Sequence, residues 1–149
     1  MAECNMDMKK CPMPVQDPDV RNKNFDEVAL GYTYDMAVNE ARRCLNCPKK
    51  PCQSACPVQI DIPAFIERVA NEDMDGAFEI LSKSTSLPAV CGRVCPQENQ
   101  CEGKCVRGIK GEAVGIGRLE RFVADYHREH CTDTPEMPDQ NGHKVAVIG

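Results

Sequence analysis

Tryptophan is absent from this chain, and aromatic residues together make up only 5% of its 149 residues. A chain of this length forms about one domain, and with so few large side chains its apolar core will be small. No apolar run approaches the roughly 20 residues that a membrane-spanning helix needs. We therefore expect one small domain with no membrane partner, and a further source of cross-linking that compensates for the small core.

Positive charge is also scarce, with 18 basic against 23 acidic residues and a net charge of -5. Proteins that bind nucleic acid present a basic face, so no nucleic-acid partner is expected. Residues 1–7 lack the charged and then apolar pattern of a secretory signal. We accordingly expect a cytoplasmic, reducing location, where closely spaced cysteines serve metal or redox chemistry more often than disulfides.

Cysteine is the residue type that the chain has in excess, with eleven in total. Eight of them fall in two runs, namely Cys44, Cys47, Cys52 and Cys56, then Cys91, Cys95, Cys101 and Cys105. Each run contains a Cys-Pro step, at Cys56-Pro57 and at Cys95-Pro96. Iron–sulfur proteins use this pattern, in which the cysteine before proline binds the other cluster of a pair. The two runs indicate two [4Fe-4S] clusters.

The spacing also predicts how the ligands divide between the two clusters. The first three cysteines of the first run would hold cluster one, and Cys56 would cross to cluster two. Cys95 and Cys101 would hold cluster two, while Cys105 would cross back to cluster one. If only cysteines are counted, Cys91 would be the eighth ligand and would belong to cluster two.

Other uses of these cysteines remain alternatives at this point. The gap between Cys47 and Cys52 is wider than in bacterial ferredoxins, so a zinc-binding structural or interaction domain without redox activity is the main rival. The zinc interpretation is weakened because the chain has a single C-x2-C knuckle. A disulfide framework fits poorly with an odd number of cysteines and a reducing location. Cys4 and Cys11 have no close cysteine neighbours, and we expect them to be free thiols.

The periodicity of apolar residues predicts helices around the cysteine runs. We expect a helix over residues 33–45 with Thr33 as its N-cap, and another that Asp61 caps and Pro63 follows in the first turn. A third begins near Asp75, and the clearest extends from about 114 to 128. The first cysteine run is predicted to be loop because of its three prolines. The fold class is therefore all-α.

Composition divides the chain into four parts. Residues 1–31 are polar and contain several prolines, which predicts an arm over the surface, and residues 32–130 form the helical two-cluster domain. Residues 131–143 are predicted to be a linker. Residues 144–149 resemble the first strand of a dinucleotide-binding unit, with Gly149 as the first glycine of its cofactor-binding turn. An ordinary terminal strand would have the same pattern.

A family resemblance is carried by five stretches, Arg43–Cys47, Cys52–Pro57, Ala89–Pro96, Cys101–Cys105 and Gly115–Phe122. With them, the chain resembles the N-terminal iron–sulfur domain of the small (β) subunit of NADPH-dependent glutamate synthase. It is also similar to the matching domain of dihydropyrimidine dehydrogenase. The resemblance implies an α-helical ferredoxin-type fold that wraps around two clusters, followed by a linker and the start of a truncated FAD-binding domain.

The resemblance also implies a ligand set. One cluster would be held by Cys44, Cys47, Cys52 and Cys105. The other would be held by Cys56, Cys95 and Cys101, with Glu120 as a ligand in place of Cys91. Without the family, Glu120 would be a solvated residue paired with Arg118 or Arg121, and thiolate is the softer and more usual ligand. Both candidates for the last ligand therefore stay open.

Cofactors and partners follow from the same resemblance. The parent enzyme would be an NADPH-dependent glutamate synthase-type oxidoreductase whose FAD and NADPH sites lie outside this chain. Two [4Fe-4S] clusters would relay electrons between that FAD and a flavin-bearing partner such as the glutamate synthase large subunit. Basic residues in or near the cysteine runs could offset the charge of the clusters or be merely solvated: Lys49, Lys50, Arg93, Lys104 and Arg107.

Overall fold

The computed structural model describes residues 4–131 and 139–148, and its regular structure is helical. These residues contain no β-strand, and their single bridge of extended chain is the antiparallel pair Val15 and Ala29. The predicted all-α class is confirmed. Across the same two ranges, no helix is both long enough and apolar enough to cross a membrane.

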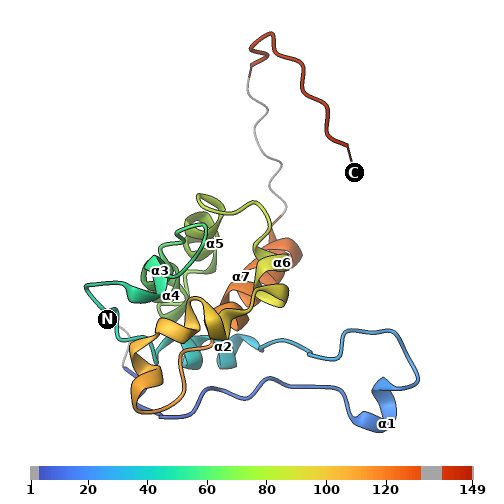
Figure 1. Ribbon diagram of the computed structural model, residues 1–149. Helices are drawn as coiled ribbons and strands as arrows, with labels where there is room; N and C mark the ends of the chain where they lie inside the picture. The colour runs from blue at the N-terminus through green and yellow to red at the C-terminus, as the bar shows by residue number, and fades with distance from the viewer. Residues whose placement is uncertain (1–3, 132–138, 149) are drawn as a thin grey trace.

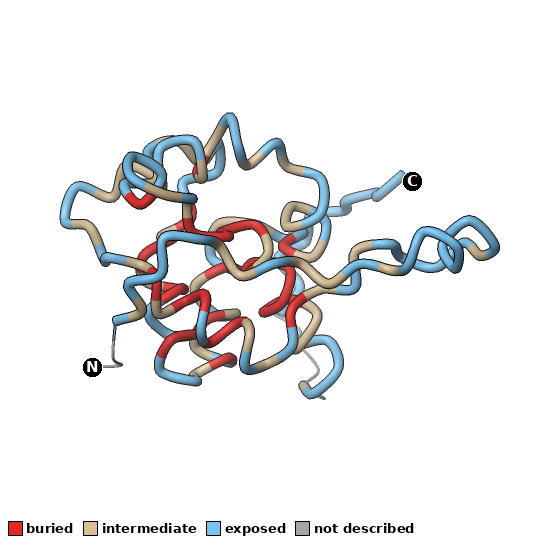
Figure 2. The backbone as a smooth tube through the Cα atoms, turned by 90° about the horizontal axis from the view of Figure 1, so that it is seen from below, coloured by how far each residue is buried: buried red, intermediate tan, exposed pale blue. Residues whose placement is uncertain are grey.

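Four helices form the body of the domain (Figure 1). They are α2 (Tyr34–Ala41), α4 (Ile62–Ala70), α5 (Met74–Ser82) and α7 (Ile116–His130). Each contributes an apolar face to one core, in which Phe65, Leu81 and Leu119 are completely buried. Figure 2 shows that the buried residues are concentrated in the body and are almost absent from the projecting segments.

Helix caps account for where the body helices begin. The side chains of Thr33 and Asp61 accept hydrogen bonds from the backbone N–H groups of Met36 and Ala64, as the sequence predicted. Asp73 caps α5 through Gly76, so this helix begins at Met74, just before the expected start. Helix α2 ends at Ala41, whereas the predicted helix continued to residue 45, and the chain turns there toward Cys44.

The cysteine runs contain short helices as well as turns. The first run was expected to be loop, but Pro51–Ser54 form the helix α3. Proline is compatible with the first turn of a helix, because the backbone N–H that it lacks would have no partner within the helix there. Cys91 lies in α6 (Pro88–Val94), and Cys95 follows it as the C-cap. Three 3₁₀ turns follow: η1 (Gln97–Asn99), η2 (Glu102–Lys104) and η3 (Val106–Ile109).

The N-terminal segment has two parts. The stretch up to about residue 14 lies along the body, where Arg107 donates hydrogen bonds to the carbonyl oxygens of Asn5 (3.0 Å) and Asp7 (2.7 Å). Residues 15–30 project from the body as an extended hairpin (Figures 1 and 2). This hairpin contains α1 (Pro18–Arg21) and is closed by the backbone bonds Gln16 N to Val28 O and Leu30 N to Pro14 O. We call residues 15–30 the hairpin arm.

The C-terminal residues 139–148 have no regular secondary structure. Val145, Val147 and Ile148 are each at least 87% exposed, so nothing in the described chain packs against the predicted strand. A strand of a parallel sheet needs neighbours on both faces, and the strand over residues 144–149 therefore stays a prediction. Gly149 and residues 132–138 of the predicted linker lie outside the described residues.

Candidate metal centre

Four cysteines from both runs line one cavity beneath the body helices. Cys44, Cys47, Cys52 and Cys105 all line this cavity. The rest of its wall is largely apolar, with Ile62, Ile66, Val114 and Ile116. These cysteines are the set that the resemblance implies for one cluster, and they come from segments up to 61 residues apart. Thiolates in a dry apolar pocket suit an iron–sulfur cluster.

Local backbone geometry presents the first three of these cysteines. Asn46 and Lys50 have the positive φ angles of 45° and 42°, so the chain turns sharply on either side of Cys47. Lys50 then donates to the carboxylate of Asp61, with Nζ 2.7 Å from Oδ2, and ties the loop to the start of α4. Both side chains of this pair are more than a third exposed, so its main effect is on loop geometry.

Burial favours the protonated form of two of these thiols, Cys44 and Cys52, when no metal is bound. It raises the pKa of Cys44 to about 11 and also raises the pKa of Cys52. The N–H of Asn46 donates to the sulfur of Cys44 and opposes this rise. Cluster iron binds thiolates, so loading of the site releases protons. Hydrogen bonds to sulfur also adjust the reduction potential of a cluster.

A second group of candidate ligands gathers around α7. Cys56, Cys95, Cys101 and Glu120 are close enough for their charges to affect one another. Burial, with smaller contributions from the negative charges of Glu102, Cys56 and Glu120, raises the pKa of Cys101 to about 12. Burial also raises the pKa of Cys95, with contributions from Cys91, Glu120 and Cys56. These are the residues that the resemblance implies for the other cluster.

Glu120 has the environment of a ligand and not of a surface residue. It is only 7% exposed, and its Oε1 atom has no hydrogen-bond partner in the part of the chain that is described. Burial raises the pKa of this carboxyl to about 7. The alternative of a solvated Glu120 paired with Arg118 or Arg121 is wrong. Those arginines bond instead to Cys11 O and Tyr32 and to the residues Glu27, Ala29 and Asp125.

Cys91 remains close to this second group. It lies one helical turn before Cys95 on α6, and its charge and a hydrogen bond both act on Cys95. Its sulfur also lies 3.7 Å from Oγ1 of Thr85. Cys91 therefore has a hydrogen-bonding partner, whereas the buried oxygen of Glu120 has none among the described residues. This difference favours Glu120 as the last ligand.

A close helix crossing brings the two elements of the second group together. A Cβ atom on Gly92 of α6 would lie 2.5 Å from the backbone nitrogen of Arg121 on α7, closer than such atoms ever approach. The helices can meet here only because residue 92 is glycine. Since Gly92 lies three residues before Cys95 and Arg121 follows Glu120, this crossing brings the candidate ligands Cys95 and Glu120 toward each other. Sequence analysis missed this role, although a glycine inside a helix was a signal.

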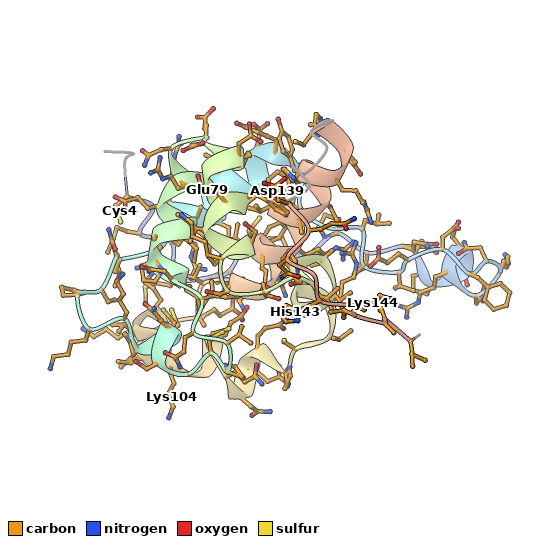
Figure 3. The ribbon with its side chains drawn as sticks, turned by 90° about the horizontal axis from the view of Figure 1, so that it is seen from above. Cys4, Glu79, Lys104, Asp139, His143 and Lys144 are labelled. Carbon is orange, nitrogen blue, oxygen red and sulfur yellow. The ribbon has the colours of Figure 1, made fainter. Side chains whose placement is uncertain are left out.

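The basic residues near the runs have different surroundings. Arg107 and Arg93 are held in hydrogen bonds to the N-terminal residues and to carboxylates. Lys49 and Lys104 are exposed, and Figure 3 shows Lys104 pointing outward from η2. The solvated interpretation therefore fits these two lysines.

Cys4 and Cys11 belong to neither group of candidate ligands. All eleven cysteines are free thiols, and Cys4 is exposed. Cys11 packs against the core, where burial and the charge of Glu40 raise its pKa. In residues 4–131 and 139–148, no three His, Cys, Asp or Glu side chains converge as closely as a single ion requires. The ligands of a cube are further apart because each binds a different iron.

Comparison with protein families decides the class of metal centre. Residues 21–132, about three quarters of the chain, match the family described as dihydropyrimidine dehydrogenase domain II, 4Fe-4S cluster. The chain belongs to this family. The match includes both cysteine runs and Glu120, so both groups of candidate ligands lie within a recognised 4Fe-4S domain.

Curated relatives agree with the family. The chain is 38% identical over 125 residues to the Escherichia coli K12 protein NAD-dependent dihydropyrimidine dehydrogenase subunit PreT, covering 84% of this chain and 30% of that protein. It is 36% identical over 147 residues to the E. coli K12 glutamate synthase [NADPH] small chain, covering 97% and 31% respectively. The chain thus spans less than a third of the length of these relatives.

Proposed function

We propose that this 4Fe-4S domain carries two clusters and transfers electrons between flavins. The observation that supports it most is the single cavity lined by Cys44, Cys47, Cys52 and Cys105. When bound there, a [4Fe-4S] cluster supplies a one-electron carrier. The chain's own residues exclude water with apolar side chains, hold the sulfurs in position and donate a hydrogen bond to Cys44.

The second cluster is proposed at the group formed by Cys56, Cys95, Cys101 and Glu120. The buried Oε1 of Glu120 needs a partner, because a carboxylate removed from water without one is costly. An iron ion would satisfy it. Cys52 lies on α3 and Cys56 follows two residues after the end of that helix, yet they belong to different groups, so the two clusters would be neighbours and could exchange electrons directly.

The parent reaction is proposed to be that of a glutamate synthase. FAD and NADPH would bind to further domains of the parent protein, and the acceptor would be a flavin-bearing large subunit, in a reducing, cytoplasmic compartment. The relative that supports this is the glutamate synthase small chain, whose match extends over 97% of the present chain.

A second candidate parent is an NAD-dependent dihydropyrimidine dehydrogenase. It is favoured by the PreT proteins, which share 37–38% identity with the chain over 84% of its length. The two parents can be separated in the complete protein purified with its partner. Glutamate formation driven by NADPH supports the first, and dihydropyrimidine oxidation coupled to NAD supports the second.

The two-cluster proposal is tested by elemental analysis of protein that is purified without oxygen. Paired four-iron sites predict about eight irons per chain, with an equal amount of acid-labile sulfide. A measured content of about four irons per chain would show that only one cluster is bound and would overturn the second cluster site. Zinc without sulfide would overturn electron transfer and support an interaction domain.

A further inference from the structure

The carboxylate of Glu27 attaches the hairpin arm to the body. Its Oε1 lies 2.6 Å from Nε of Arg93, and its Oε2 lies 3.2 Å from Nη2 of the same side chain. Oε2 also lies 3.1 Å from Nη2 of Arg121. Glu27 therefore bridges two guanidinium groups, and the hydrogen bond from Arg93 holds its pKa below the usual value.

Both arginines are close in sequence to proposed ligands of the second cluster. Arg93 lies on α6 two residues before Cys95, and Arg121 follows Glu120 on α7. Asp125 completes the network, because it accepts from Arg93 at 2.7 Å and lies 3.5 Å from Nε of Arg121. Asp125 also contacts the largely exposed Arg128 at 3.3 Å, so three arginines face two carboxylates, one on α7 and one on the hairpin arm. Without the charge of Glu27, the net positive charge of the network would rise by one.

The backbone at the base of the hairpin arm depends on the same network. Arg121 donates to the carbonyl oxygen of Ala29 at 2.9 Å and is only 8% exposed. Gly31 follows with φ of 85°, and a Cβ atom there would lie 3.4 Å from the guanidinium of Arg121. The arm therefore turns into α2 directly against the arginine that neighbours Glu120.

We propose that Glu27 is a positioning residue for the second cluster: it holds the hairpin arm against α6 and α7 and offsets the charge of the arginines beside Cys95 and Glu120. The position of the arm then sets the charge near that cluster, and with it the reduction potential. This inference rests on the proposed two-cluster function. The charge effect is specific, because the network involves neighbours of the second ligand group only.

Glu27→Gln tests this proposal by removing the charge while keeping the size of the side chain. Its matched control is Asp26→Asn, which removes the same charge from the adjacent position of the arm. Potentiometric titration followed by electron paramagnetic resonance measures both clusters separately. We expect a positive shift of one midpoint potential in Glu27→Gln, because a more positive surrounding favours reduction, and no shift in Asp26→Asn. Glu27→Asp, which retains the charge, should restore part of the wild-type value.

Hydrogen exchange of residues 15–30 gives a second measurement that does not depend on the clusters. Glu27→Gln should accelerate exchange in the hairpin arm, and Asp26→Asn should leave it unchanged. Equal shifts of both potentials, or equal effects of the two variants, would overturn the role of Glu27 while leaving the two-cluster function intact. A wild-type protein without two clusters would overturn both proposals.

Discussion

Glu40 and Arg43 form a completely buried ion pair, with Oε1 of Glu40 2.6 Å from Nη1 of Arg43. The pair is fully hydrogen-bonded: Glu40 accepts from the backbone N–H groups of Cys11 and Gly115. Arg43 donates to backbone carbonyl oxygens on both sides of it, those of Asp7, Met8, Glu112 and Ala113. The pair thus connects the N-terminal segment, α2 and the start of α7 immediately beside Cys44.

Arg43→Met should destabilise the domain strongly, because it leaves Glu40 charged and buried without its partner. Removing one member of such a pair typically costs about 3–5 kcal/mol. The free energy of unfolding in urea measures this loss. Arg42→Met is the matched control, since Arg42 contacts Glu72 at 3.5 Å on the surface and should lose at most about 1 kcal/mol. Similar losses in the two variants would contradict the structural role given to the pair.

Gly92→Ala should remove the second cluster and retain the first. The added methyl group would separate α6 from α7, and with them Cys95 from Glu120, at an overpacking cost of about 1–3 kcal/mol. The iron content should fall from about eight to about four per chain. In Gly108→Ala the new methyl group would meet Ala113 at an ordinary 3.7 Å, so the iron content should not change. Full iron in Gly92→Ala would show that the helix crossing does not position the ligands.

The last ligand of the second cluster can be decided by two variants. The Glu120→Ala variant should lose that cluster or retain it with fewer irons, because one iron would lack its ligand. The wild-type carboxylate oxygen is free to bind iron, since it has no hydrogen-bond partner in the described chain. Cys91→Ser should keep the cluster, since the hydroxyl group can replace the thiol beside Thr85. Iron content and the number of paramagnetic centres per chain after reduction measure both. The reverse result would assign the ligand to Cys91.

The stability of the iron-free protein should depend on pH through Glu120. Burial raises its pKa in the folded state from 4.5 to about 7, so between these values the folded state binds the additional proton. The stabilisation is complete below pH 4.5 and is lost as the pH rises through 7. The full shift corresponds to roughly 3 kcal/mol.

Glu120→Gln removes this titration while keeping the shape of the side chain. Urea unfolding of the iron-free variant at pH 5 and at pH 7.5 should therefore show a smaller difference than wild type does. The comparison between the two proteins cancels the titration of other groups. An equal pH dependence in both would mean that Glu120 is exposed to water when iron is absent.

Much of the fold could be predicted from local sequence. The caps Thr33 and Asp61 and the apolar spacing of α7 are signals within one turn of the helix that they start or stabilise. The loop predicted over Pro51 failed because proline is compatible with the first turn of a helix and the rule against it applies to the interior. Cysteine spacing indicated how seven of the eight candidate ligands divide between two groups, and the family resemblance added Glu120 before any geometry was known.

By itself, the sequence determined the all-α class and the type of metal chemistry, because helix caps, apolar periodicity and cysteine spacing are local. Only the tertiary structure decided that four cysteines share one cavity and that Glu120 is buried without a hydrogen-bonding partner in the described chain. It also decided that Glu27 reaches Arg93, which lies 66 residues away. These relationships depend on how α6, α7 and the hairpin arm pack together, and packing brings together residues that no local pattern connects.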